Sequence, residues 1–306
     1  MKVLLATQKP FAAQAVKGIT QIVEEAGHSV ALLEKYANQE DLVAAVADVD
    51  ALIIRSDKVT AEVIAAAPKL KIVVRAGAGY DNVDLEAATK AGIVVMNTPG
   101  QNSNAVAELA IALMIFMARN QFNPTTGSEI QGKTLGIQGY GNVGRLIGGK
   151  AKALGMNVLA FDPVLSAEAI AQAGAEPVAD LKELYSRSNY ISLNIPLLPV
   201  TERSIGEELL SLMPKGGTLL NTARKEVIDE EGLFAVLGKR EDLKYATDVM
   251  PDNYSALQEA YGLRVYANSK KMGAQTAEAN INAGLAAARQ IVDYFLTGNT
   301  KFQVNK

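Results

Sequence analysis

Residues 134–144 read TLGIQGYGNVG, and this stretch decides the fold of the chain. Residues 134–138 are a mostly apolar run typical of a buried strand, and glycines follow at positions 139, 141 and 144 in the spacing G-x-G-x-x-G. Residues 142–154 then have the composition of a helix. A strand, a glycine turn and a helix in this order are typical of a Rossmann unit that binds a dinucleotide.

Each position of the motif has a physical task in such a unit. Gly139 permits the tight turn, Gly141 lets the backbone approach a pyrophosphate, and Gly144 allows the helix to pack closely on the strand. Asn142 and Val143 open the helix, whose free N–H groups and partial positive charge favour phosphates. We therefore predict that these five residues contact the cofactor.

The strand expected at 157–161 is followed by Asp162, 18 residues after Gly144. A carboxylate there accepts hydrogen bonds from the adenosine ribose hydroxyls and repels a 2′-phosphate, and Pro163 offers no cation. The pattern predicts NAD rather than NADP. The glycine spacing alone also occurs in ordinary turns, and Asp162 alone could be a solvated strand end, but their combination favours a cofactor site.

Short apolar runs alternate with alanine-rich stretches over the whole chain, which predicts parallel strands joined by helices. The expected strands are 3–6, 29–33, 51–54, 71–74, 93–96, 134–138, 157–161, 190–194, 218–221, 245–247 and 264–266. The expected helices are 11–27, 39–47, 60–67, 84–91, 104–119, 142–154 and 276–296. The glycine motif lies far from the N-terminus, so the first part of the chain should form a separate domain. The sequence thus predicts an α/β protein with two doubly wound parallel-sheet domains.

The composition excludes several classes of function. The chain has 306 residues, no cysteine and one histidine, so disulfides, a cysteine nucleophile, and thiolate or multi-histidine metal sites are ruled out. A net charge of −3 with no basic run argues against nucleic acid as a partner. The most apolar stretch, residues 105–118, is too short to span a membrane, and the N-terminus turns polar too soon for a signal peptide. We expect a cytoplasmic protein with no metal and no membrane partner.

Four segments together resemble the D-2-hydroxyacid dehydrogenase family over nearly the whole chain. They are IRSDKVT at 54–60, RAGAGYDNVD at 75–84 with NTPGQNSNAVAE at 97–108, the glycine motif, and LNTAR at 220–224 with VIDEEGL at 227–233. Within the family, the phosphoglycerate dehydrogenases are the most similar. The motifs are highly specific for the family and less specific for the substrate.

The resemblance implies a flavodoxin-like substrate domain built from residues 1–98 and 280–306, and a Rossmann NAD-binding domain at 99–279. It also implies a reaction cleft between the two domains. Members of the family usually form homodimers through the cofactor domain, with a segment like the apolar residues 104–119. Larger relatives carry a regulatory domain after the last helix, which we expect this form to lack.

The resemblance also assigns roles to individual residues. Arg224 matches the essential arginine, which anchors the substrate carboxylate and the reacting oxygen. The backbone N–H groups of Gly77, Ala78 and Gly79 match the carboxylate-binding loop, and Asn102 lies where it could reach the substrate. The remaining positions that match cofactor contacts are Pro196, Thr201, Thr222, Ala223, Asp248 and Gly273.

The expected acid–base pair departs from the family pattern. Lys271 occupies the position of the catalytic histidine, and Asn253 occupies that of the glutamate that orients it. A lysine needs no tautomer fixed, and a neighbouring carboxylate would hold it in its charged form. We hypothesise that Lys271 is the acid/base, with burial near Arg224 favouring its neutral form. Whether Asp248 or Asp252 takes the place of the glutamate stays open, as does the alternative that the substitution leaves an inactive protein.

Arg55 and Ser56 match the positions that contact the 3-phosphate in phosphoglycerate dehydrogenases, with Lys58 nearby. The leading interpretation is NAD-dependent oxidation of 3-phospho-D-glycerate to 3-phosphohydroxypyruvate, the first step of serine biosynthesis. One alternative is another small 2-hydroxy acid, such as hydroxypyruvate, glyoxylate or D-lactate as substrate or product, with Arg55 then only a cation at a strand end. A second is a non-catalytic NAD-binding sensor or co-repressor.

Overall fold

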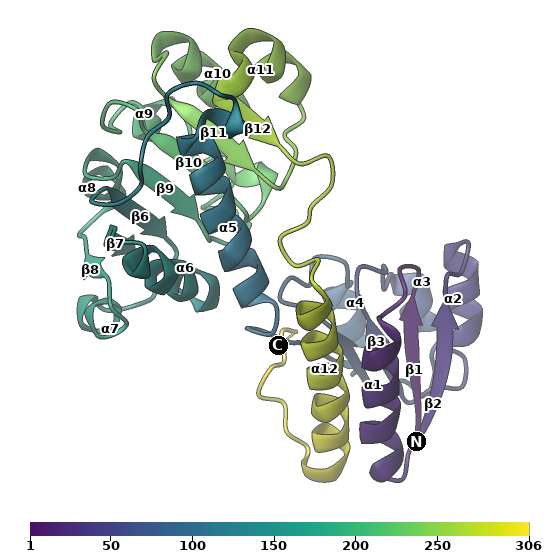
Figure 1. Cartoon of the computed structure of the whole chain (residues 1–306). Coiled ribbons are helices and arrows are strands. Elements are labelled where there is room, and N and C mark those ends of the chain that lie inside the picture. The colour runs from purple at the N-terminus through teal and green to yellow at the C-terminus, as the bar shows by residue number, and fades with distance from the viewer. Residues whose placement is uncertain (306) are drawn as a thin grey trace. The chain divides into compact units, whose positions relative to one another are not determined.

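A computed structural model describes residues 1–305 of the chain, which divides into two compact units (Figure 1). The terminal unit consists of Met1–Asn102 together with the chain from Gln275 onward, and the central unit is Ser103–Ala274. Each unit contains one sheet in which every strand pairing is parallel. Within the described residues, no helix has the length and apolar character needed to cross a membrane.

The terminal unit has a five-stranded sheet in the order β2-β1-β3-β4-β5. This is the flavodoxin-like order, in which the direction of winding reverses between β1 and β3. Its elements are β1 (Lys2–Thr7), α1 (Ala13–Glu25), β2 (Ser29–Glu34), α2 (Gln39–Ala45), β3 (Ala51–Ile54), α3 (Ala61–Ala65), β4 (Ile72–Arg75), α4 (Leu85–Lys90), β5 (Val94–Asn97) and α12 (Ala277–Thr297).

The central unit has a seven-stranded sheet in the order β12-β11-β10-β9-β6-β7-β8. This is the Rossmann order with one further strand, and the winding reverses between β6 and β9. Its strands are β6 (Thr134–Gln138), β7 (Asn157–Phe161), β8 (Glu176–Pro177), β9 (Tyr190–Leu193), β10 (Thr218–Asn221), β11 (Lys244–Thr247) and β12 (Val265–Ala267). Its helices are α5 (Ser103–Ala118), α6 (Asn142–Ala153), α7 (Ala167–Gln172), α8 (Leu181–Ser186), α9 (Glu207–Leu210), α10 (Glu230–Lys239) and α11 (Tyr254–Tyr261), with 3-10 turns at Asn120–Phe122, Lys225–Val227 and Gly262–Arg264.

Helices bury both faces of each sheet, and this explains the sequence pattern. Every residue of β3, β9 and β10 is buried, so these strands read as continuous apolar or small runs without alternation. The predicted fold class is therefore confirmed. The elements β8 and α7 to α11 were not predicted. Of these, β8 and α7 to α9 span only two to six residues and show no complete helical or strand period. The prediction also missed the longer helices α10 and α11, of ten and eight residues.

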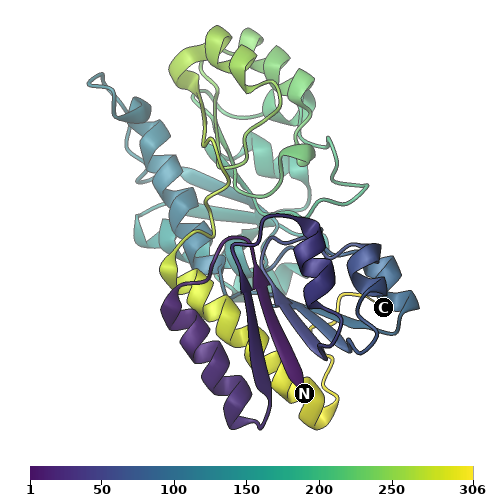
Figure 2. The ribbon, with the colours of Figure 1, turned by 90° about the vertical axis from the view of Figure 1, so that its right-hand side faces the viewer.

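Helices α1 and α12 lie side by side in the terminal unit (Figures 1 and 2), although most of the sequence separates them. Glycines on both helices allow the close approach. A β-carbon at Gly18 would lie 2.5 Å from Leu285 Cδ2, and one at Gly284 would lie 2.9 Å from Ile19 Cδ1. The chain that leaves the central unit is thereby fastened to the first helix of the terminal unit.

The last described residues protect the open edge of the terminal sheet. Val304 N–H donates to the carbonyl of Val95, and Asn305 Oδ1 accepts from Val95 N–H at 2.8 Å. Asn305 Nδ2 also donates to the carbonyl of Ile93 at 2.8 Å. These bonds satisfy backbone groups of β5 that an edge strand would otherwise expose to intermolecular pairing.

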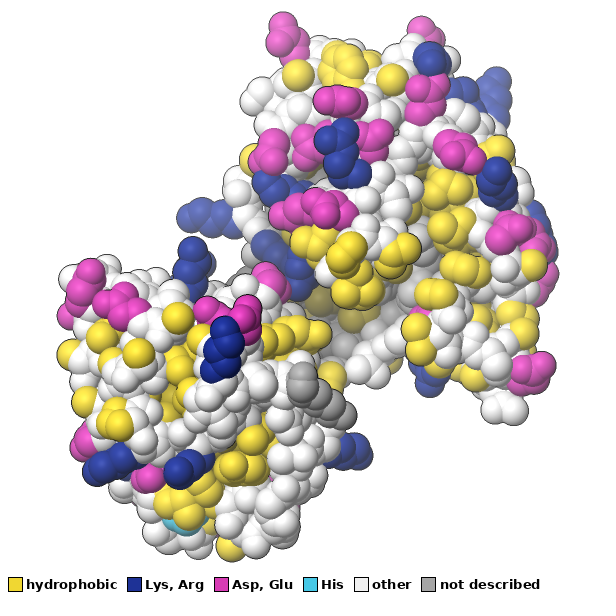
Figure 3. All heavy atoms as spheres, turned by 180° about the vertical axis from the view of Figure 1, so that it is seen from behind, with side chains coloured by type: hydrophobic (Ala, Val, Ile, Leu, Met, Phe, Trp, Pro, Cys, Tyr) yellow, Lys and Arg dark blue, Asp and Glu magenta, His cyan; other side chains and the backbone are white. Residues whose placement is uncertain are grey.

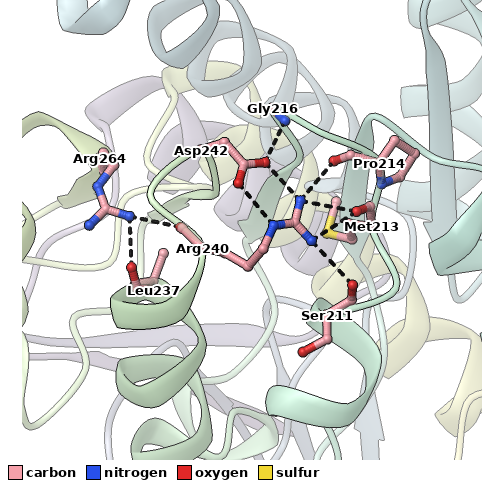
Figure 4. Close-up of polar contacts among 8 residues, drawn as sticks. All are labelled: Ser211, Met213, Pro214, Gly216, Leu237, Arg240, Asp242 and Arg264. Carbon is pink, nitrogen blue, oxygen red and sulfur yellow. Dashed lines mark hydrogen bonds and ion pairs between the residues drawn. The ribbon is translucent and has the colours of Figure 1, made fainter.

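A hydrogen-bond network around the Arg240 guanidinium stabilises the loops that precede β10 and β11 in the central unit (Figure 4). Arg240 Nε and Nη2 donate to Asp242 at 2.9 and 2.7 Å, and further N–H groups of Arg240 reach the carbonyls of Ser211, Met213 and Pro214. Asp242 also accepts from Gly216 N–H at 2.7 Å. The hydrogen bond from Arg240 is the main reason that the pKa of Asp242 lies well below its usual range.

Replacing Asp242 with Asn should lower the free energy of unfolding of the central unit by about 1–3 kcal/mol at pH 7, because Arg240 loses its charged partner. The folded state lowers the pKa of Asp242, so its stabilisation is present above the unfolded pKa, about 4, and is lost as the pH falls below it. Urea unfolding should show that the difference in free energy of unfolding between wild type and Asp242→Asn is smaller at pH 3 than at pH 7.

Glu208→Gln is the matched control, because Glu208 pairs with Lys182 in the same unit while its side chain is 78% exposed. This variant should change stability by less than about 0.5 kcal/mol. An equal stability gap for Asp242→Asn at both pH values would contradict the assigned role of Asp242.

Candidate active site

The glycine loop joins β6 to α6 where the strand order of the central sheet reverses. Gly139 has φ +88°, and a β-carbon there would lie 2.7 Å from the carbonyl oxygen of Asn194. A β-carbon at Gly144 would overlap the carbonyl oxygen of Gly139. Gly141 differs from both, because it has φ −77° and no atom within 4 Å of its ideal β-carbon. The fold therefore requires glycine at 139 and 144, whereas only a ligand would require it at 141.

Helix α6 begins directly after Gly141, and no side chain caps its N-terminus. Asn142 is exposed and Val143 is partly exposed in the first turn. Uncapped N–H groups at the start of a twelve-residue helix leave hydrogen-bond donors and a partial positive charge for an anion. The open space at Gly141 is adjacent to these donors.

Asp162 follows β7 and fastens the glycine loop. Its Oδ2 accepts from Tyr140 N–H at 2.8 Å, and its Oδ1 accepts from Val164 N–H at 2.9 Å. The loop is further held because Gly139 N–H donates to the carbonyl of Phe161. A carboxylate has about four acceptor positions, so these two bonds leave capacity for hydroxyl donors.

A row of buried polar atoms without partners marks the carboxyl edge of the central sheet. Among the described residues, no hydrogen bond reaches Asn194 Oδ1, Thr222 Oγ1, Asp248 Oδ1 or Asn268 Oδ1. These residues directly follow β9, β10, β11 and β12, which are neighbours in the sheet. Buried polar atoms are nearly always hydrogen-bonded, so four at one sheet edge indicate a place where a polar ligand completes the structure.

Arg224 and Lys271 lie together at this edge. Arg224 Nη1 donates to the carbonyl oxygen of Ala223 at 3.0 Å, and Lys271 Nζ donates to the same oxygen at 3.0 Å. Asn221 fixes the backbone of this loop, because its side chain accepts from Ala223 N–H and donates to the carbonyl of Arg224. Lys271 is exposed, so the expectation that it is buried was wrong.

Asp248 holds the segment that follows Lys271. Its side chain is fully buried, and Oδ2 accepts from Gly273 N–H at 2.6 Å and from Met272 N–H at 3.2 Å. A β-carbon at Gly273 would lie 2.8 Å from the same oxygen, so this position needs a glycine. Asp248 thereby sets the backbone from which Lys271 projects.

Asn253 stands at the position where the family has a glutamate. Asn253 donates its backbone N–H and its side chain to Glu230, while its Oδ1 is buried and has no partner among the described residues. Asp252 forms an ion pair with Lys225 and is 79% exposed. Of the two aspartates considered from the sequence, only Asp248 has a described hydrogen bond to the Lys271 segment.

The loop after β9 contains the predicted contacts Pro196 and Thr201. Thr201 Oγ1 donates to the carbonyl of Pro196 at 2.7 Å and accepts from Leu198 N–H at 2.8 Å. The loop also exposes apolar side chains, with Val200 79% exposed. The Thr201 hydroxyl therefore fixes the shape of this loop, whose apolar side chains are exposed. The loop begins at Asn194, the residue whose carbonyl lies against Gly139.

In the terminal unit, Arg55 directly follows β3, and its guanidinium is held from several sides. Nη1 donates to the carbonyls of Lys9 and Pro10 at 3.2 and 3.3 Å, and Nη2 donates to Asn280 Oδ1. The Arg55 Cζ atom lies 5.1 Å from the centre of the Phe11 ring. Ser56 is exposed beside it.

The loop of Gly77, Ala78 and Gly79 follows β4, the next strand of the same sheet. Gly77 has φ +151°, and a β-carbon there would overlap the guanidinium of Arg75. Arg75 Nε donates to the carbonyl of Arg55 at 3.0 Å. The absence of a side chain at Gly77 therefore leaves room for the Arg75 guanidinium beside the loop backbone.

The single histidine lies away from these residues. His28 stands between α1 and β2, at the amino end of the strand, whereas the residues above follow the carboxyl ends. Its ring meets that of Phe295 edge to face at 5.8 Å. Figure 3 shows it in cyan on the terminal unit, with hydrophobic, acidic and basic side chains interspersed over the surface.

The sequence profile of the D-isomer specific 2-hydroxyacid dehydrogenase catalytic domain matches residues 10–305. The chain belongs to this family.

Solved and curated proteins give a consistent picture of this dehydrogenase family member. It is 49% identical to an NAD⁺-bound 3-phosphoglycerate dehydrogenase of Entamoeba histolytica, with a TM-score of 0.92 over 100% of this chain and 99% of that one. It is 39% identical over 267 residues to D-3-phosphoglycerate dehydrogenase of Methanocaldococcus jannaschii (83% of this chain, 51% of the relative) and 35% identical over 287 residues to that of Homo sapiens (89% and 54%). The chain thus spans about half the length of these curated relatives.

The predicted site residues of this family member fall into two groups. The residues of the central unit lie at the carboxyl edge of the central sheet, and those of the terminal unit lie at the carboxyl edge of the terminal sheet. Asn102 is the exception, because it is the last residue of the first segment of the terminal unit, just before α5. The sequence reasoning missed three residues around Arg55, namely Arg75, Asp57 and Asn280. Arg75 ends the strand next to β3, so a signal was present, whereas Asp57 and Asn280 act through partners far apart in sequence.

Substituting the glycines should separate the requirements of the fold from those of a ligand. Gly139→Ala should lower the free energy of unfolding by about 2 kcal/mol or more, because of its positive φ and its contact with Asn194. Gly141→Ala should change it by less than about 0.5 kcal/mol. Thermal and urea unfolding of both variants measure this, and equal destabilisation would give Gly141 a structural role instead.

Proposed function

We propose that this chain catalyses the NAD-dependent oxidation of 3-phospho-D-glycerate to 3-phosphohydroxypyruvate. The observation that carries the proposal is the row of unpartnered polar atoms at Asn194, Thr222, Asp248 and Asn268, next to the paired cations Arg224 and Lys271. Such an edge suits a polar ligand whose anionic part meets the cations. The names of the similar proteins support this substrate and cofactor.

The described residues fit NAD. The start of α6, with the open space at Gly141, suits a pyrophosphate, and Asp162 keeps acceptor capacity for ribose hydroxyls. Thr222 and Asp248 present a hydroxyl and a carboxylate oxygen to an amide-bearing ring. When bound, NAD accepts the hydride from the substrate carbon.

Arg224 anchors the substrate in this proposal. Its guanidinium forms a bidentate pair with the substrate carboxylate and polarises the hydroxyl oxygen that becomes the carbonyl oxygen. The Asn221 side chain fixes the Arg224 backbone, so the guanidinium starts from a defined position. In the terminal unit, the backbone N–H groups of Gly77, Ala78 and Gly79 are further donors that suit a carboxylate.

Lys271 takes the hydroxyl proton as the hydride leaves. It must be neutral to do so, and the positive charge of Arg224 beside it favours the neutral amine. Asp248 fixes the backbone after Lys271 by accepting the N–H groups of Met272 and Gly273. In the reverse direction the Lys271 ammonium returns the proton to the oxygen.

Arg55 recognises the phosphate. Its guanidinium keeps two N–H groups after the bonds to Lys9, Pro10 and Asn280, and two parallel donors match phosphate oxygens. With 3-phospho-D-glycerate bound by Arg55, the proposed oxidation is the first step of serine biosynthesis.

We also propose a cytoplasmic homodimer formed through α5. Of its sixteen residues only Ser103, Asn104 and Glu108 are polar, and the partly exposed positions include Leu109, Ile111, Ile115 and Phe116. A helix that is apolar on all sides favours cover from a second subunit.

One assay tests the function against its alternatives. NADH absorbance is followed with 3-phosphoglycerate, glycerate and D-lactate, and with the corresponding keto acids in reverse. Turnover with the phosphorylated pair alone is expected. Preference for an unphosphorylated acid would indicate another dehydrogenase, and tight NADH binding without turnover would indicate a sensor. Gly141→Ala should weaken NADH binding about tenfold or more, because its methyl group occupies the approach of the pyrophosphate.

Lys271→Ala should lower kcat about 10²- to 10⁴-fold while NADH binding, followed by fluorescence, stays near that of wild type. Lys271→Arg should lose as much, because a guanidinium keeps its proton. Lys270→Ala is the matched control, since it removes an exposed neighbouring lysine. Full turnover by Lys271→Ala would exclude the acid/base role.

Arg55→Ala should raise KM for 3-phosphoglycerate about 10- to 100-fold and leave KM for NAD within about threefold, because only the phosphate loses its donors. Lys90→Ala removes a cation of the same unit that pairs with Glu86 at the surface, and should change neither constant. Equal effects of Arg55→Ala on both KM values would argue against phosphate recognition by Arg55.

A further inference from the structure

We infer that Asp57 is a positioning residue that sets the orientation of Arg55 and thereby the affinity of the terminal unit for the phosphate of the substrate. The inference rests on the proposed function for the identity of the ligand. It concerns a residue that does not itself touch substrate, cofactor or reacting atoms, and it follows from the contacts of one buried carboxylate.

The Asp57 carboxylate joins three loops of the terminal sheet. Oδ1 accepts from Gln8 N–H after β1 and from the Tyr36 hydroxyl after β2, each at 2.7 Å, and Oδ2 accepts from Arg55 N–H after β3 at 3.2 Å. The residue is 5% exposed. Burial, and then the hydrogen bond to Asp57, raise the pKa of Tyr36, so the phenol stays a donor.

The loop that Asp57 fastens is the loop that holds Arg55. Gln8, whose N–H Asp57 binds, is followed by Lys9 and Pro10, whose carbonyls accept from Arg55 Nη1, and then by Phe11, whose ring lies beside the guanidinium. Asp57 therefore acts on Arg55 at both ends: it binds the backbone N–H directly and the side chain through the 8–11 segment.

Asn280 completes the arrangement from α12. Its Oδ1 accepts from Arg55 Nη2, and its Nδ2 donates to the carbonyl of Thr276 at 2.9 Å, which fixes the amide. Three of the five N–H groups of Arg55 are thus used within the described structure, and Nε–H and one Nη2–H are left for a ligand. Burial lowers the pKa of Arg55, and the charge of Asp57 opposes this, so the carboxylate also helps to keep the partly buried guanidinium charged.

A guanidinium held in one orientation loses less conformational entropy when it binds a phosphate, so its positioning increases affinity. The electrostatic effect of Asp57 has the opposite sign, because a nearby negative charge repels a phosphate. The two effects predict opposite outcomes when the charge is removed. Positioning predicts weaker phosphate binding by Asp57→Asn, whereas simple electrostatics predicts tighter binding.

The test measures binding of inorganic phosphate and of 3-phosphoglycerate to the full chain by titration calorimetry. Asp57→Asn should weaken both about tenfold or more, because the Asn amide nitrogen cannot accept the hydrogen bond that one carboxylate oxygen accepts. In the assay, KM for 3-phosphoglycerate should rise by a similar factor, while kcat and KM for NAD change by less than about threefold. Unchanged or tighter phosphate binding would overturn the inference.

A double-mutant cycle separates positioning of Arg55 from general damage to the unit. In an Arg55→Ala background, Asp57→Asn should cause no further loss of phosphate affinity, because its effect passes through the guanidinium. Equal losses in both backgrounds would indicate a merely structural role. Asp48→Asn removes an exposed carboxylate of the same unit, which pairs with Lys2, and should leave phosphate affinity unchanged.

Tyr36→Phe keeps the test decisive if Asp57→Asn does not fold. It removes one of the three bonds to the carboxylate and should weaken phosphate binding about two- to fivefold, and an unchanged affinity would overturn the inference. The calorimetric arm is independent of turnover. If wild type binds phosphate but does not oxidise 3-phosphoglycerate, the proposed function fails while the inference is still decided by Asp57→Asn.

Discussion

A parallel sheet buried on both faces gathers its ligand-binding polar groups at the carboxyl ends of its strands, and the candidate site of this protein depends on that constraint. In the central unit, four neighbouring strands each end beside a buried polar atom without a described partner, on Asn194, Thr222, Asp248 and Asn268. A polar ligand that pairs with these atoms would stabilise the folded state, and the same atoms would discriminate between ligands that can hydrogen-bond to them and ligands that cannot.

The sequence predicted the fold class because two local signals agreed. The glycine motif at 139–144 identified one sheet and its reversal point, and the long apolar runs identified parallel strands. Gly139 and Gly144 were predictable because the turn and the packing of helix on strand leave no room for a β-carbon there. Lys271 was found only because it stands where the family places a histidine, and its exposure, which the sequence does not encode locally, was predicted wrongly.

What the sequence could not predict is the support that residues distant in the chain give one another. Arg55 and Asn280 are 225 positions apart, yet their side chains share a hydrogen bond because α12 returns to the terminal unit. Asp57 likewise binds Gln8 and Tyr36, which precede it by 49 and 21 positions. No periodicity or motif records such contacts, since each partner is an ordinary polar residue in its own segment.

Three aspartates share one way of supporting the site. Asp57, Asp162 and Asp248 each come at or just after the end of a strand and accept hydrogen bonds mainly from backbone N–H groups. The loops that they fasten carry Arg55, the glycine turn and Lys271. A carboxylate satisfied by N–H groups can order a loop without occupying its cation. The Arg55 loop shows the consequence, because two N–H groups of its guanidinium bind no described residue, whereas an ion pair with Asp57 would occupy them.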